Sequence, residues 1–106
     1  MIQFFDLREA FPDAANHIEM IPEHMRNSVA MWILYGNLPG DFFRAFLSNN
    51  LRLAVGHADK INGARLADWV RYFHNYAPSK CHGSDEKMRL WSKTGGLRGR
   101  RAEDAA

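Results

Sequence analysis

The sequence predicts a compact, all-α single domain of four to six short helices, and three observations lead to that fold class. The 106 residues are 46% hydrophobic and 25% charged, which is the composition of one globular domain. Proline, glycine and asparagine divide the chain into pieces of about 8 to 15 residues, which suit short helices. The one Asn-Gly pair, at residues 62–63, lacks the alternating flanks of a β-hairpin. We expect residues 1–97 to form the helical domain and residues 98–106 to form a basic and polar C-terminal tail.

The clearest predicted helix spans residues 63–77. Its apolar side chains recur at the spacing of one helix face: Leu66, Trp69, Val70, Phe73 and Ala77. Asn62 can accept hydrogen bonds from the first free backbone N–H groups, and Pro78 cannot continue the helix. We therefore expect this whole face to lie in the core.

A second helix is predicted at residues 22–35. Pro22 suits the first helical position because its missing N–H has no partner there. An apolar stripe follows helical spacing: Ile21, Met25, Val29 and Trp32. A buried strand at residues 29–35 is the alternative, and the helical period favours the helix. Gly36 is expected to end the helix in the left-handed conformation, with Leu38 packing back on it.

Three shorter helices are predicted at residues 40–48, 51–58 and 84–94. Asn49 or Asn50 is the candidate cap of the second, and Ser84 caps the third. The pattern defines residues 1–20 least, and there we expect Asp6 to cap a turn through Phe11. Five aromatic residues should be mostly buried and close to one another: Trp32, Phe46, Trp69, Phe73 and Trp91.

Charge is distributed unevenly along the chain. Residues 1–59 carry four basic and seven acidic residues, a formal charge of −3, and residues 60–106 carry ten and five, a charge of +5. The basic residues Arg98, Arg100 and Arg101 follow a Gly-Gly pair near the end. A basic C-terminal part is typical of proteins with an anionic partner, and a solvated tail that aids solubility is the alternative.

Motifs for catalysis and for cofactor or metal binding do not occur in the sequence. Neither glycine-rich phosphate-binding pattern is present, and no pair with the spacing of a C-x-x-C or H-x-x-x-H metal site exists. We predict no cofactor, no metal and no enzymatic activity, with the single Cys81 a small buried residue rather than a nucleophile. The longest apolar run, residues 30–35, is too short to span a membrane, and residues 1–11 lack the apolar run of a signal peptide. These features favour a cytoplasmic protein.

The best candidate for a binding surface is a stripe on the predicted helix at residues 63–77. Arg65, Tyr72 and Tyr76 share this stripe, at about 100° from the centre of the apolar face. Tyrosine and arginine are enriched among the residues that dominate protein interfaces. We predict that the stripe binds a partner, extended by Arg98, Arg100 and Arg101. The alternative is that both tyrosines pack against a neighbouring helix with their hydroxyl groups in water.

Several segments within residues 21–97 carry a resemblance to known proteins: residues 21–25, 35–36, 38–40, 47–51, 58–59, 75–78 and 81–87, with Phe42 and Trp91. Together they resemble a family of small uncharacterised proteins encoded by tailed bacteriophages and prophages. The resemblance implies a phage origin and carries no catalytic or binding residue over to this chain.

The resemblance and the absent motifs together favour a small, non-enzymatic accessory protein in the host cell cytoplasm. We expect it to bind and modulate a host protein, such as a defence, transcription or recombination factor. A nucleic-acid-binding accessory protein that uses the basic C-terminal part is the alternative. An enzyme using Cys81 is a third, weaker hypothesis.

Overall fold

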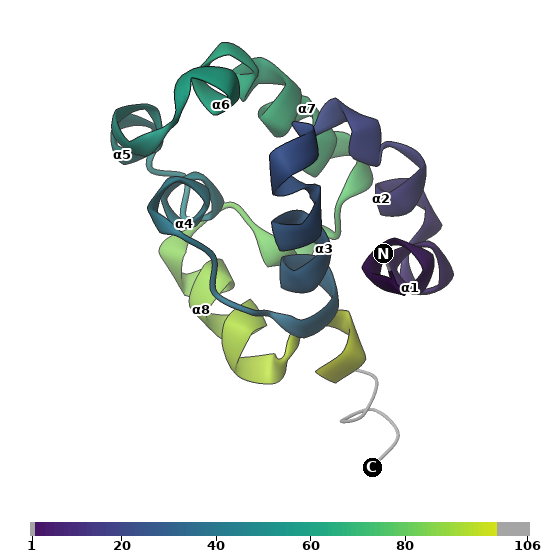
Figure 1. The fold of residues 1–106 in the computed structure, drawn as a ribbon. Coiled ribbons are helices and arrows are strands. Elements are labelled where there is room, and N and C mark those ends of the chain that lie inside the picture. The colour runs from purple at the N-terminus through teal and green to yellow at the C-terminus, as the bar shows by residue number, and fades with distance from the viewer. Residues whose placement is uncertain (1, 100–106) are drawn as a thin grey trace.

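Every regular element in residues 2–99, the part of the chain that the computed structural model describes, is helical. The α-helices are α1 (Ile2–Ala10), α2 (Pro12–Asn16), α3 (Arg26–Tyr35), α4 (Asp41–Leu47), α5 (Leu51–His57), α6 (Lys60–Ala64), α7 (Leu66–Tyr76) and α8 (Asp85–Thr94). Three 3₁₀ helices join them: η1 (Ile18–Met20), η2 (Glu23–Met25) and η3 (Ser79–Cys81). The predicted all-α single domain is confirmed, and Figure 1 shows the helices arranged around the central α3.

Several predicted helix ends agree with the structure. Gly36 ends α3 with a φ of 68° and Gly95 ends α8 with a φ of 79°, both in the left-handed conformation. The side chain of Asn50 accepts a hydrogen bond from the backbone N–H of Leu53, and Ser84 likewise caps α8. Leu38 is half-exposed, so the expectation that it packs back on the helix end was wrong.

The predicted helix at residues 63–77 begins differently from the expectation. Asp59 accepts a hydrogen bond from the backbone N–H of Asn62 and starts the short α6, and a break at Arg65 precedes α7. Asn62 is therefore inside a helix, with a buried side chain, and does not cap α7. The sequence pattern missed the break because Asp59 offers an earlier cap that competes with Asn62.

The N-terminal region is more helical than the sequence indicated. Asp6 lies inside α1 and does not cap a turn, and η1 and η2 follow in the segment that leads to α3. α1 packs against α2 and α3, and α2 with η1 packs against α7. This N-terminal segment therefore covers one side of α7.

The predicted aromatic core is formed largely as expected. Trp32, Trp69, Phe73 and Trp91 are fully buried, and Phe46 is partly buried. The rings of Phe46, Trp69 and Phe73 lie with centroids 5.2 to 6.1 Å apart. Trp91 donates an indole hydrogen bond to the backbone oxygen of Trp32, and Trp32 donates one to the backbone oxygen of Cys81. These two bonds tie α8, α3 and η3 together.

Two glycines allow the ends of α3 and α8 to meet closely. A Cβ atom at Gly96 would lie 2.7 Å from the carbonyl group of Leu34, and one at Gly36 would lie 2.7 Å from the backbone oxygen of Trp91. Both glycines have positive φ angles. A side chain at either position would push the two helix ends apart.

Candidate functional site

The stripe predicted to bind a partner is largely occupied by the protein's own N-terminal segment. Tyr72 is fully buried, and its hydroxyl donates a 2.7 Å hydrogen bond to the backbone oxygen of Ala14 in α2. Burial raises the pKa of this hydroxyl above its ordinary value. The prediction that Tyr72 belongs to an exposed partner surface was therefore wrong, because α2 and η1 cover this side of α7.

The two other residues of that stripe also make contacts within the chain. Arg65 donates to the backbone oxygen of Met20 at 2.6 Å and pairs with Asp68 at 2.9 Å. The ring of Tyr76 stacks on His17 with centroids 3.6 Å apart. The alternative interpretation, tyrosines packed against a neighbouring element, describes Tyr76 and Tyr72 better, although the Tyr72 hydroxyl meets a backbone oxygen rather than water.

The basic residues of the predicted tail divide into one that the structure describes and two that it does not. Arg98 lies against α1, with its guanidinium 3.8 Å from a carboxylate oxygen of Asp6 and 4.0 Å from one of Glu9. These contacts partly neutralise Arg98 and join the C-terminal region to the N-terminal helix. Arg100 and Arg101 lie outside the described residues, so their part in binding stays a prediction.

The apolar face of α7 is not buried as a whole. Trp69 and Phe73 are in the core, whereas Val70 is 51% exposed and Leu66 is half-buried. The buried side of α7 is rotated toward Tyr72, because the N-terminal segment covers that side. The prediction that Val70 lies in the core was wrong, and the apolar edge formed by Leu66 and Val70 is left open.

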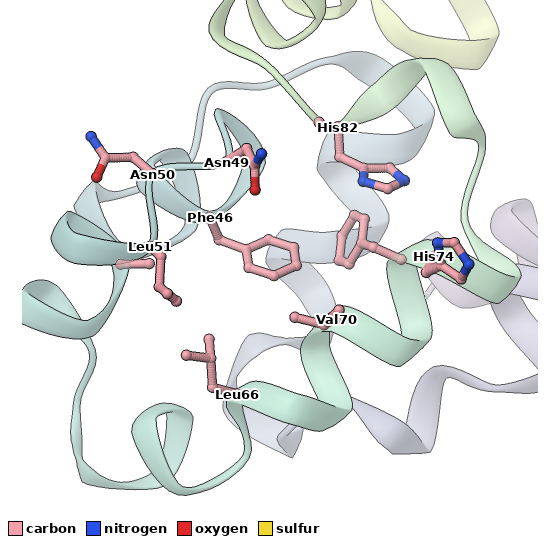
Figure 2. A pocket seen from close by; sticks show the side chains of 11 residues that line it. Phe46, Asn49, Asn50, Leu51, Leu66, Val70, His74 and His82 are labelled. Atoms are coloured by element: carbon pink, nitrogen blue, oxygen red, sulfur yellow. The ribbon is translucent and has the colours of Figure 1, made fainter.

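That open edge forms one wall of a groove, which we call the α5–α7 groove. The cavity has a volume of about 170 Å³. It is lined by Phe46, Asn49, Asn50, Leu51, Ala54, Leu66, Val70, Phe73, His74, His82 and Gly83. Figure 2 shows Leu51 reaching in from α5, Leu66 and Val70 reaching in from α7, and the ring of Phe46 between them. In residues 2–99, α5 packs extensively on α4 and only weakly on α7.

One end of the groove is polar. The ring of His82 lies edge-on to Phe73, with centroids 5.4 Å apart, and Figure 2 shows it above the apolar floor. Burial holds the pKa of His82 below its ordinary value of 6.5, and the nearby Lys87 and His74 lower it further. The ammonium group of Lys87 lies at this end, 3.8 Å from where a Cβ atom at Gly83 would stand, and Gly83 lines the groove.

Residues 46–83 carry more basic than acidic side chains, but none of these lysines and arginines lines the groove. Residues 46–83 contain five lysine and arginine residues and two aspartates, a formal charge of +3 without the histidines. Both aspartates have partners: Asp59 pairs with His24, and Asp68 pairs with Arg65 and Arg71. Among the lining residues that the structure describes, none carries a carboxylate.

Aliphatic side chains of α5 and α6 are also exposed, and Leu51 among them lines the groove. Leu51 is 67% exposed, and Leu53, Val55 and Ile61 are each about half exposed. Scattered apolar residues such as Leu53, Val55 and Ile61 are normal on a protein surface, whereas the exposed Leu51 and Val70 lie together in the groove lining. The helix pattern contained a signal for this, because apolar residues at positions 51, 53 and 55 cannot all face one side of a helix.

Other chemistry is sparse in the part of the chain that the structure describes. No group of three histidine, cysteine, aspartate or glutamate side chains converges in residues 2–99 as a metal site would require. Cys81 is fully buried, as predicted, and burial raises the pKa of its thiol. No helix in these residues has the length and apolar character needed to span a membrane.

Comparisons with known proteins supply no relative for this chain. No protein-family model matches it, and searches among curated proteins and solved structures found no similar protein.

Proposed function

We propose that this chain is a small protein-binding module that docks on a host protein through the α5–α7 groove and thereby modulates it. The observation that carries the proposal is the open apolar edge of α7, with Val70 51% exposed beside a cavity of about 170 Å³. An edge of this kind costs solubility and is retained where a partner covers it.

The geometry of the groove supports docking of a folded or helical segment. Its floor comes from α4 and α7, both anchored in the core through Phe46 and Phe73, so little side-chain freedom is lost on binding. Its two walls are α5 and α7. α5 is held by its packing on α4 and packs only weakly on α7. A partner's side chain can therefore enter between rigid surfaces, as at the centres of many interfaces.

The class of partner follows from the sequence resemblance. Small phage-encoded proteins of the kind that residues 21–97 resemble are made inside a bacterial host, so we propose a host protein in the cytoplasm as the partner. The nucleic-acid alternative depended on the basic tail. It receives less support, since Arg98 is engaged by Asp6 and Glu9.

The experiment compares two variants in which glutamate replaces an exposed aliphatic residue, one in the groove and one outside it. Val70→Glu puts a charge into the groove, and Leu90→Glu puts the same charge on α8, where Leu90 is 52% exposed and lies outside the groove lining. Tagged wild type and both variants are incubated with bacterial lysate. Any protein retained by the wild type is then purified and its affinity for all three forms is measured, together with its own activity.

We expect the purified partner to bind wild type and Leu90→Glu with affinities within about twofold, and Val70→Glu at least about tenfold more weakly. Circular dichroism and thermal melts establish that both variants are folded. If the partner binds Val70→Glu with the affinity of wild type, the groove is not the docking surface. The same conclusion follows if Leu90→Glu lowers the affinity as much as Val70→Glu does. Binding that leaves the partner's activity unchanged would contradict modulation.

A further inference from the structure

We propose that the segment docking in the α5–α7 groove is an acidic amphipathic helix, which inserts one large apolar side chain and directs a carboxylate toward His74, His82 and Lys87. This inference rests on the proposed function and names the chemistry of the partner's segment.

The size of the cavity indicates a single anchor residue. A protein cavity of roughly 150 Å³ lined by leucine, isoleucine and phenylalanine binds benzene. The α5–α7 groove encloses about 170 Å³ above Phe46, Leu66 and Phe73, so one phenylalanine ring or one leucine side chain fills it. The exposed apolar residues beside it, Leu51 and Val70, can then contact the next apolar residues of the same helix at positions i+3 and i+4.

The charge at the polar end of the groove determines which charged residues the docking helix should carry. The groove lining in the described residues contains no carboxylate, and its polar end holds His74, His82 and Gly83. The ammonium group of Lys87 lies beside Gly83, 3.8 Å from where a Cβ atom there would stand. A basic or neutral helix would offer this ammonium group no partner. Glutamate or aspartate residues on the docking helix would satisfy it and speed the encounter.

The same charge distribution argues against a second copy of this chain as the occupant. A two-fold contact through the groove places the same surface of both copies together. Neither copy would then offer a carboxylate from its groove lining to the Lys87 of the other, because that lining contains none in the described residues. An acidic helix supplies one.

The test uses three synthetic, fluorescein-labelled 14-residue helical peptides and the full chain. All three have leucine residues flanking a central position on one face. The first has a central phenylalanine and glutamate on both borders, the second replaces the glutamates by lysines, and the third replaces the phenylalanine by alanine. Fluorescence anisotropy gives each dissociation constant. We expect the first peptide to bind about tenfold more tightly than either of the others.

Two lysines of α8 provide a matched pair of variants. Lys87→Glu reverses the charge near His82, and Lys93→Glu reverses an exposed charge outside the groove lining. Lys87→Glu should weaken binding of the first peptide by about fivefold, and Lys93→Glu should weaken it by less than about twofold. Val70→Glu should weaken binding of this peptide at least as much as Lys87→Glu does.

Four outcomes would overturn the inference. They are equal binding of the acidic and basic peptides, equal effects of Lys87→Glu and Lys93→Glu, binding of 3-phenylpropionate as tight as that of the acidic peptide, and a dimer in sedimentation equilibrium that Val70→Glu abolishes. If a host protein still depends on Val70 while the peptides show no charge preference, the proposed function stands and this inference alone fails. If the acidic peptide binds but no host protein depends on Val70, the proposed function fails instead.

Discussion

The hydroxyl of Tyr72 donates a 2.7 Å hydrogen bond to the backbone oxygen of Ala14, and this contact joins α7 to an element 58 residues earlier in the chain. It turns the tyrosine side of α7 into an internal contact. As a consequence, the opposite edge of the apolar face, at Leu66 and Val70, is the one left open. The position of the N-terminal segment thus decides which face of α7 is free to bind.

Removing the Tyr72 hydroxyl should destabilise the protein without affecting the groove. Tyr72→Phe keeps the buried ring and removes the donor to Ala14, so we expect a loss of about 1–2 kcal/mol of unfolding free energy. Urea denaturation measures it. The acidic peptide should bind the variant as it binds wild type. A variant of unchanged stability would contradict the described packing of α2 on α7.

Two glycine-to-alanine changes should have opposite effects on stability. Gly96→Ala places a Cβ atom 2.7 Å from the backbone of Leu34 at a φ of 69°, so we expect a loss of about 3 kcal/mol or more. Gly56→Ala, inside α5 with no atom within 4 Å, should gain about 0.5–1 kcal/mol. Thermal melts compare the stability of both variants with that of wild type. A Gly96→Ala variant as stable as wild type would show that the ends of α3 and α8 do not meet as described.

Cys81 should be inert toward thiol reagents in the native protein. It is fully buried and burial raises the pKa of its thiol, so the reactive thiolate forms only when the structure opens. We expect labelling by a disulfide reagent at neutral pH to be at least about a hundredfold slower than in urea-unfolded chain. Rapid native labelling would contradict the position of η3 in the core.

The stability of the protein should fall as the pH drops below 6.5, in part through His82. Its pKa in the folded protein lies below 6.5, so the unfolded chain binds the additional proton first and protonation favours unfolding. The loss begins near pH 6.5 and continues until the folded-state pKa is reached. We expect His82→Gln to reduce this slope in urea denaturation between pH 7 and pH 5, and an unchanged slope would contradict the burial of the ring.

The sequence predicts most of this fold because its helix ends carry local signals. These signals act on backbone groups within a few residues, so they can be predicted without the tertiary structure. They are Gly36, Asn50, Ser84 and Gly95. The start of α7 was harder, because two caps compete, at Asp59 and at Asn62, and only packing selects between them.

The candidate site was less predictable because it depends on contacts between distant segments. Helical periodicity groups Leu66, Val70 and Phe73 on one apolar face but does not say what covers it. The covering element for the neighbouring side of α7 is α2 with η1, from the region of the sequence with the weakest pattern. The sequence indicated an exposed Tyr72 and a buried Val70 on α7. In the structure Tyr72 is buried and Val70 is exposed.

Amide chemical-shift mapping tests most directly whether the α5–α7 groove is the docking surface. Isotope-labelled full chain is titrated with the acidic, phenylalanine-anchored peptide. We expect saturable shifts of the amides of Leu51, Val70 and His82, which line the groove, and no shifts of the amides of Leu38 and Leu90. Shifts centred on Leu38 and Leu90, or no shift anywhere at millimolar peptide, would contradict docking in the groove.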